Sequence, residues 1–212
     1  RIVLDERGRV AEVAPVQRND AHRLIEACMI TANSCAARLL SKAKVPTLYR
    51  NHAPPSPGGM ESLAAYLGNL GIAFEVPDPL TAKAVQALLA RLAAKPETQP
   101  LETMVLRALS QANYGPERIG HFGLALTHYA HFTSPIRRYP DLLVHRGLRA
   151  LLQSDRDFPE LYRSPEAPAA KAFEDAYPYD VPAMLTLGAS LSLRERGADA
   201  AAFDFEAWLK CE

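Results

Sequence analysis

The residues best suited to chemistry lie in one short segment, where a serine, two arginines and an aspartate follow one another closely. Ser134 followed by Pro135 predicts a helix beginning at this serine, since serine is a preferred N-cap and proline is tolerated in the first turn. Arg137 then falls in that opening turn, where unpaired backbone N–H groups and a fork-shaped guanidinium suit a phosphodiester. Asp141, one turn further on, is expected to hold Arg137 by an i,i+4 ion pair.

Positive charge gathers around this predicted helix although the chain as a whole is neutral, with 24 basic and 24 acidic side chains. Arg138, Arg146 and Arg149 add to the charge of Arg137. A nucleic-acid-binding protein need not be basic overall, but it must concentrate positive charge somewhere. On spacing alone, a capped helix with solvated arginines is about as well supported as a phosphate site.

The segment from Gly120 to Arg146 resembles, almost residue for residue, the signature of the RNB catalytic domain found in exoribonucleases of the ribonuclease R and ribonuclease II family. The resemblance implies that Arg137 contacts the scissile phosphate. It also implies that Tyr129, Ser134 and Arg138 belong to the surrounding RNA-binding site.

The family's activity is the 3′-to-5′ hydrolysis of single-stranded RNA, processively, to nucleoside 5′-monophosphates. The partner implied is therefore single-stranded RNA, and no obligate protein partner is expected. A channel too narrow for a duplex, with stacking and backbone contacts, would accept any base. The alternative is a non-catalytic RNA-binding module or a degenerate homologue.

Asn19, Glu26 and Asn33 recur every seven residues and so share one face of a predicted helix. Such a polar stripe is more often a solvated face. The stretch from Arg18 to Asn33 resembles the family helix whose polar face lines the channel for the RNA 3′ end, which implies RNA contacts for all three residues. The family has a second acid beside Glu26, where this chain has Ala27.

Two further residues are candidates through weaker matches. Arg50 lies in a stretch that is similar to the corresponding stretch of the family's sequences. It either contacts RNA or is a solvated arginine in a turn. Glu195 matches a family acid near the terminal nucleotides, in a final helix that resembles the one closing the catalytic domain. Its alternative is a solvated helix acid paired with a neighbouring arginine.

The resemblance implies magnesium in the intact enzyme, held by an aspartate-rich loop. Magnesium prefers clustered oxygen ligands, and the nearest approach in this chain is Asp155-Arg156-Asp157. We therefore expect no metal bound by this chain alone, and no nuclease activity without the family's aspartates. Zinc at His128 and His131 is disfavoured, since no cysteine completes a familiar spacing.

The expected fold class is α+β and mostly helical, a fragment of the RNB catalytic domain with a few strands packed on long helices. Apolar spacing, caps and turn residues set the expected elements. They are a hairpin from Ile2–Leu4 and Val10–Val16, a loop at 45–59, a strand at 121–126, and helices at 21–42, 60–70, 81–94, 101–113, 134–152 and 181–210, the last broken or bent near Gly188 and Gly197.

Residues 1–212 are expected to be the C-terminal part of that catalytic domain, without the family's upstream metal loop and downstream OB-fold domain. Residues 154–179 are expected to form a surface excursion. Cys28 and Cys35 are predicted core thiols, and the odd cysteine count argues against a disulfide framework and for a reducing cytoplasm. No apolar run reaches the roughly 20 residues needed to span a bilayer.

Overall fold

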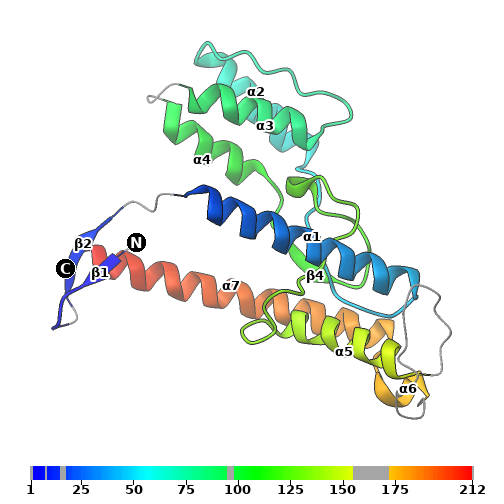
Figure 1. Ribbon diagram of the computed structural model, residues 1–212. Helices are drawn as coiled ribbons and strands as arrows, with labels where there is room; N and C mark the ends of the chain where they lie inside the picture. The colour runs from blue at the N-terminus through cyan, green and yellow to red at the C-terminus, as the bar shows by residue number, and fades with distance from the viewer. Residues whose placement is uncertain (1, 8, 15–17, 95–97, 155–171, 212) are drawn as a thin grey trace.

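The computed structural model describes residues 2–7, 9–14, 18–94, 98–154 and 172–211 (Figure 1). It confirms a mostly helical α+β chain with two small two-stranded sheets among these residues. The elements are β1 (Ile2–Leu4), β2 (Val10–Val13), α1 (Asp20–Lys42), β3 (Tyr49–Asn51), α2 (Pro57–Asn69), α3 (Ala82–Ala93), α4 (Gln99–Ala108), β4 (Asn113–Gly115), η2 (Phe122–Leu124), α5 (Tyr139–Gln153), α6 (Phe173–Ala176) and α7 (Val181–Cys211). Within the described ranges, no helix combines the length and apolarity needed to cross a lipid bilayer.

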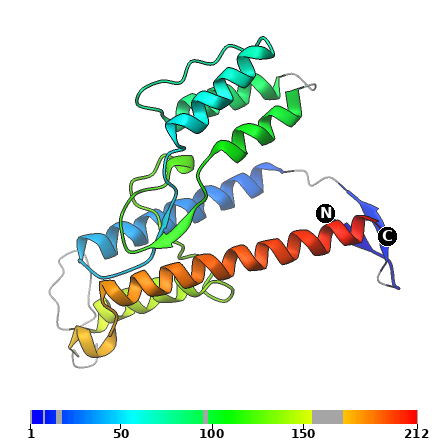
Figure 2. The ribbon, with the colours of Figure 1, turned by 180° about the vertical axis from the view of Figure 1, so that it is seen from behind.

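Helix α1 is half inside the core and half open. Asn19 caps it, because its side chain accepts a hydrogen bond from the backbone N–H of His22 at 3.0 Å. The first half leaves Leu24 and Ile25 exposed, whereas Leu40 in the second half is fully buried. Figures 1 and 2 show the β1–β2 hairpin beyond the open end of α1.

The main core lies where α1, α5 and α7 meet the β3–β4 pair. Leu40, Leu143 and Met184 are fully buried there. Helix α7 lies so close to β4 that a Cβ at Gly188 would be 2.7 Å from the carbonyl oxygen of Tyr114. A break at Gly188 or Gly197 is therefore wrong: α7 is one continuous helix, and Gly188 permits its close approach to β4.

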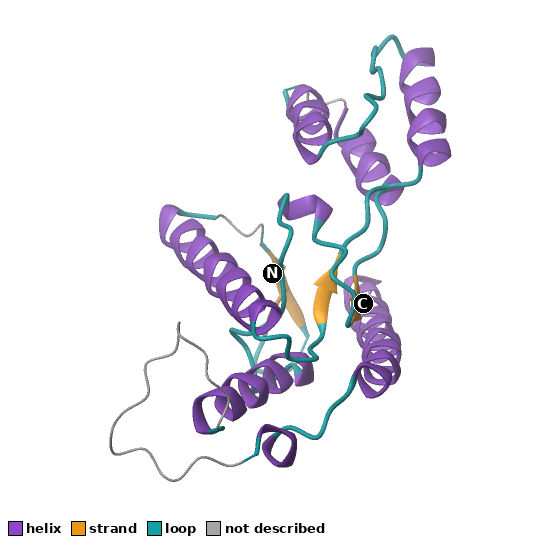
Figure 3. Ribbon diagram, turned by 90° about the vertical axis from the view of Figure 1, so that its right-hand side faces the viewer, coloured by secondary structure: helices purple, strands orange, loops and turns teal. Residues whose placement is uncertain are grey.

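Helices α2, α3 and α4 form a separate unit with its own core. Met60, Leu67, Leu88 and Val105 are nearly or fully buried between them. The three helices stand apart from the main body in Figures 1 and 3. The sequence predicts all three, although α4 ends at Ala108 rather than Asn113.

Two strands replace segments predicted as loop and as helix end. β3 pairs antiparallel with β4, and Arg50 lies opposite Tyr114. Each strand has three residues, too few for an alternating pattern, and its partner is about sixty residues away in the sequence. This pairing brings residues of the candidate site onto one small sheet.

The strand predicted at 121–126 is wrong. The chain forms the short 3-10 helix η2 there, and Ala125 adopts a left-handed conformation with φ of 54°. His121 makes isolated bridges to His52 and Leu126. A compact turn thus forms where the apolar run suggested extended chain.

Two smaller expectations also fail. Most of the predicted excursion, residues 155–171, lies outside the described residues, but Phe173 and Tyr177 are buried in the main core. The end of that segment is therefore not on the surface.

Cys28 and Cys35 are exposed, not core thiols, because Cys28 lies in the open half of α1 and Cys35 on its outward side.

Candidate functional site

The loop before α5 is held in place by Asn33 of α1. The Asn33 side-chain oxygen accepts hydrogen bonds from the backbone N–H of Phe132 at 2.9 Å and of Thr133 at 3.2 Å. Its amide donates to the hydroxyl of Tyr129 at 3.0 Å. Asn33 is 2% exposed, so this expected RNA-binding residue works mainly as the buried anchor of the loop.

Asp141 anchors the same loop from α5. It is 0% exposed, accepts a hydrogen bond from the backbone N–H of Ser134 at 2.8 Å, and pairs with the guanidinium of Arg138 at 2.9 Å. The predicted pair between Arg137 and Asp141 is therefore wrong, and Arg138 takes that place. A buried carboxylate with a charged partner fixes the direction of the guanidinium.

The helix start predicted at Ser134 is also wrong. Helix α5 begins at Tyr139, with Arg138 as its N-cap residue and Pro140 in its first turn. Residues 134–138 form a turn in which the backbone N–H groups of Arg137 and Arg138 donate to the Ser134 carbonyl. The anion site predicted from free helix amides around Arg137 is thus absent at that position, since those N–H groups are used in the turn.

The side chain of Arg137 is exposed and makes no hydrogen bond or ion pair with the residues that the structure describes. Its positive charge nevertheless reaches the buried ring of His131, whose pKa it helps to lower. Arg137 therefore lies on the exposed side of the loop before α5, and no described residue accepts a hydrogen bond from its guanidinium N–H groups.

Arg50 and Glu195 are brought together across 145 residues of sequence. Their side chains form an ion pair at 2.5 Å, and Arg50 also lies over the ring of Tyr114, 4.6 Å from its centroid. Arg50 therefore has two partners in the folded chain and is not a solvated turn residue.

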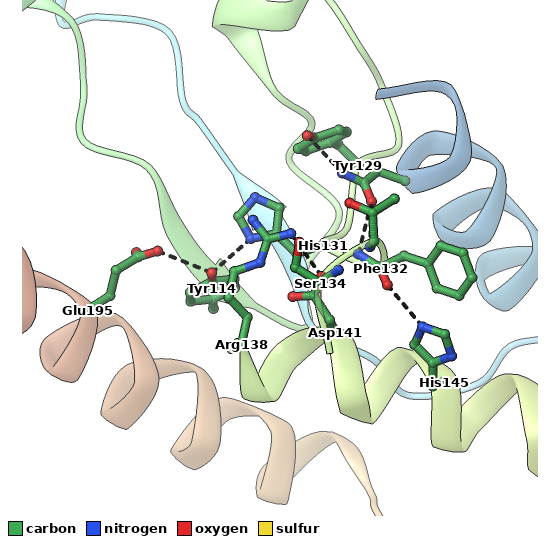
Figure 4. A network of polar contacts seen from close by, with 11 residues as sticks. Tyr114, Tyr129, His131, Phe132, Ser134, Arg138, Asp141, His145 and Glu195 are labelled. Atoms are coloured by element: carbon green, nitrogen blue, oxygen red, sulfur yellow. Dashed lines mark hydrogen bonds and ion pairs between the residues drawn. The ribbon is translucent and has the colours of Figure 1, made fainter. Parts of the chain in front are cut away.

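Tyr114 joins this ion pair to the loop that carries Ser134 and Arg138. Its hydroxyl donates to Glu195 at 3.2 Å and lies 2.8 Å from Nδ1 of His131 (Figure 4). The sequence analysis missed Tyr114. Its one signal in the sequence was an aromatic residue between asparagine and glycine. That signal does not indicate a site unless the pairing of Tyr114 with Arg50 of β3 is already known.

The electrostatics of the region are dominated by arginine. Burial, together with the charges of Arg138, Arg50, His121 and Arg137, lowers the pKa of His131 to about 3. His131 is therefore neutral near pH 7. Burial raises the pKa of Tyr114, so its hydroxyl stays protonated. His131 and Tyr114 therefore add no charge of their own, and the field of the nearby arginines favours an anionic ligand.

A cavity of about 640 Å³ lies between the open half of α1 and this loop. Several expected site residues line it together: Asn19, Glu26, Asn33, Tyr129 and Arg138. Ile25, Met29 and Leu124 give the cavity an apolar side, and Arg18 pairs with Glu26 at its rim. Arg50 and Glu195 lie in the adjoining Tyr114 network, and Arg137 does not line the cavity.

The carboxylates near the cavity do not fit a magnesium site. Glu26 pairs with Arg18, Glu195 with Arg50 and Asp141 with Arg138, so each negative charge faces an arginine rather than another acid. Among the described residues, no group of three or more histidine, cysteine, aspartate or glutamate side chains is placed to hold a metal ion. What these residues provide is a partly apolar binding surface on which carboxylates hold the arginines in place.

Comparison with protein families gives a match to the RNB domain over residues 1–154. Ribonuclease R of Escherichia coli (strain K12) is 41% identical over 212 residues, covering 100% of this chain and 25% of the relative. Ribonuclease R of Thermotoga maritima is 36% identical over the same length, 28% of that relative. The chain thus spans about a quarter of the length of these curated relatives.

The fold resembles solved structures of the same kind. Mycoplasma genitalium RNase R in complex with double-stranded RNA matches with a TM-score of 0.80 and 26% identity, covering 99% of this chain and 35% of that chain. Yeast Ssd1, a pseudonuclease, matches over 76% of this chain with a TM-score of 0.56 and 24% identity, which supports the fold alone. With its signature segment, its long-helix architecture and these matches, the chain belongs to the RNB-domain family.

Proposed function

We propose that this chain is part of a 3′-to-5′ exoribonuclease that hydrolyses single-stranded RNA processively to nucleoside 5′-monophosphates. The observation that carries the proposal is the cavity of about 640 Å³, in which Glu26, Tyr129 and Arg138 from distant sequence segments meet beside the exposed Arg137. Membership of the RNB-domain family supports the same activity.

In this proposal the RNA 3′ end enters the cavity along α1. The apolar side formed by Ile25, Met29 and Leu124 would contact base and ribose surfaces, and the polar atoms of Asn19 and Glu26 would contact the ribose or base edges. Such contacts tolerate any base, because every base has an apolar face. Arg138 is held toward the cavity by Asp141 and is positioned for a backbone phosphate.

Arg137 would contact the scissile phosphate as an electrostatic stabiliser. Its guanidinium has no partner among the described residues, so its donors are available for phosphate oxygens. It would come from a turn rather than from a helix start. This requires no free helix amides, only that the turn keep its shape through Ser134 and Asp141.

Magnesium is proposed as the cofactor of the longer enzyme and would stabilise the developing charges of hydrolysis. Its ligands would be carboxylates other than Glu26, Asp141 and Glu195, which are engaged by arginines. We further propose a cytoplasmic location, which agrees with the free thiols of the three cysteines.

The test is Arg137→Ala in the longer protein that contains this chain. Losing one stabilising donor typically costs about 3 kcal/mol of the barrier, so RNA degradation should slow by about 100-fold while RNA binding persists. Arg107→Ala on α4, also an exposed arginine, is the matched control and should change neither. Unchanged degradation by Arg137→Ala would remove this residue from the site.

A second measurement separates the enzyme from the alternative, a non-catalytic RNA-binding module. The 212-residue chain alone should bind single-stranded RNA but show no magnesium-dependent digestion. The longer protein should digest RNA if it is an enzyme and only bind it if it is a degenerate homologue. Digestion by the purified 212-residue chain would contradict our assignment of its carboxylates to arginine pairs.

A further inference from the structure

A second cluster of cations lies at the other end of α1, outside the cavity. Arg118 donates one guanidinium nitrogen to the hydroxyl of Ser41 at 2.8 Å and lies 3.0 Å from Nε2 of His128. The other ring nitrogen of His128 lies 3.0 Å from the hydroxyl of Thr127. Arg38 is one turn before Ser41 on the same helix. None of these residues lines the cavity around Arg138.

The hydrogen bonds fix the orientation of the groups in this cluster. Because the guanidinium of Arg118 can only donate, Nε2 of His128 must accept, and its Nδ1–H then donates to Thr127. His128 is thus a neutral ring that holds Arg118 in place from one side, while Ser41 holds it from the other. The remaining N–H groups of Arg118 are free to bind a ligand.

The side chain of Arg38 is held less firmly than that of Arg118, and its charge acts on the same histidine ring, that of His128. Its one described hydrogen bond is a long one, 3.4 Å to the hydroxyl of Ser34. Burial lowers the pKa of His128, and the charges of Arg118 and Arg38 lower it further, so both guanidiniums act on the same ring. The charge of Arg118 also acts on the hydroxyl of Tyr49.

The charge of this cluster is not balanced from within the described chain. Neither Arg38 nor Arg118 forms an ion pair with a described carboxylate, whereas Arg18, Arg50 and Arg138 each do. Glu117 precedes Arg118 directly, but its described hydrogen bond is through its backbone carbonyl, to Asn51. Two guanidiniums acting on one imidazole repel each other, and an anion between them would relieve that repulsion.

We propose that Arg38 and Arg118, with the hydroxyls of Ser41 and Thr127, form a second anion site that binds a phosphate group, and that His128 holds Arg118 in position for it. Two planar guanidiniums can donate several parallel hydrogen bonds to phosphate oxygens. The group could belong to an RNA backbone or to a free mononucleotide. The proposal goes beyond the proposed nuclease function and does not depend on it, since phosphate binding requires no hydrolysis.

The test compares Arg38→Gln/Arg118→Gln with the control Lys83→Gln/Arg107→Gln, which removes two exposed charges from α3 and α4. The probes are inorganic phosphate, uridine 5′-monophosphate and a short single-stranded oligouridylate. Binding is followed by the ring NMR signals of His128 and, for the oligonucleotide, by affinity over a series of salt concentrations. Arg38→Lys/Arg118→Lys keeps both charges and serves as the folding control.

If the ligand is an RNA backbone, the double glutamine variant should bind the oligouridylate about tenfold more weakly. Its salt slope should fall by about 1.4, for two lost phosphate contacts on a single strand. If the ligand is a free phosphate group, inorganic phosphate and the mononucleotide should shift the His128 signals saturably, and the double glutamine variant should lose that binding. The lysine variant should keep part of either effect.

The proposal is overturned if no probe moves the His128 signals and the double glutamine variant matches its control in affinity and salt slope. Because inorganic phosphate tests the site without RNA, this failure is distinct from failure of the nuclease proposal. That proposal depends on degradation by the Arg137 variant.

Discussion

Two groups of arginines in this chain differ in what balances their charge. Arg50 and Arg138 each pair with a carboxylate and are largely buried, with side chains 16% and 20% exposed. Arg38, Arg118 and Arg137 are exposed and form no ion pair with a described carboxylate. The first group fixes loops and strands in position, whereas the second keeps its charge available for a ligand.

The difference shows why a neutral total charge says little about nucleic-acid binding. The total does not report where the charges lie: Asp141 and Glu195 each neutralise one neighbouring arginine, whereas Arg38, Arg118 and Arg137 have no described carboxylate paired with them. Removing a member of a buried pair should therefore affect folding first, and removing an unpaired arginine should affect ligand binding or catalysis first.

The largest expected effect on stability is that of Asp141→Ala. Asp141 is 0% exposed, and its loss would leave Arg138 without its ion-pair partner and the backbone N–H of Ser134 without its acceptor. Breaking a buried pair in this way costs about 3–5 kcal/mol of unfolding free energy. Urea denaturation followed by circular dichroism measures the change.

The matched control for that experiment is Asp20→Ala, since Asp20 forms an exposed pair with Arg23 on the first turn of α1. Exposed pairs contribute little, so this variant should unfold close to the original midpoint. Equal losses for the two variants would show that burial does not distinguish the pairs.

The second prediction concerns pH and His131. Its pKa in the folded chain is lowered to about 3, first by burial and then by Arg138, Arg50, His121 and Arg137. The unfolded chain, with a histidine pKa near its ordinary value of about 6.5, binds the proton first as the pH falls. This contribution to stability is complete above pH 6.5 and is lost progressively from there toward pH 3.

Each pH unit in that window removes about 1.4 kcal/mol for one histidine. Between pH 6.5 and 5, His131→Gln should therefore lose about 2 kcal/mol less unfolding free energy than the original chain. Urea unfolding at several pH values checks this. His121, with its pKa lowered to about 4, remains in both proteins and contributes equally. A His131 ring that titrates near pH 6.5 by NMR would contradict the prediction.

A smaller effect is expected for Tyr114→Phe. The hydroxyl joins His131 to Glu195, but the ion pair between Arg50 and Glu195 and the contact of Arg50 with the ring remain without it. Losing such a hydrogen bond costs about 1 kcal/mol. Tyr66→Phe, on the exposed side of α2, is the control. A loss as large as that of Asp141→Ala would mean that Tyr114 holds the whole network.

Local signals in the sequence were sufficient for the long elements. Helical spacing identified α1, α2, α3 and α7 within a few residues of their observed bounds. These features depend on residues close together in the chain. The cavity residues Asn19, Glu26 and Tyr129 were found by resemblance to a family and by heptad spacing, not by any local rule for cavities.

Features that depend on distant contacts could not be predicted. Ser134-Pro135 is a good local helix start, but Asn33 and Asp141 bind the backbone N–H groups of Thr133 and Ser134, the next residues form a turn, and α5 begins only at Tyr139. The strands β3 and β4 exist only because they pair with each other. The partners of Arg138 and Arg50 follow from these same contacts.

The smallest effect on stability is expected for Arg137→Gln, which removes an unpaired arginine instead of a member of a buried ion pair. An exposed arginine with no described partner has no folded-state contact to lose, so its substitution should change the unfolding free energy by less than about 0.5 kcal/mol. The same urea experiment measures it, with Arg138→Gln as the paired counterpart next to it in sequence. Removing Arg138 leaves Asp141 buried without its cation and should cost several times more. If the two neighbouring arginines proved equally costly, Arg137 would have to be part of the fold, and its charge would not be free for a phosphate.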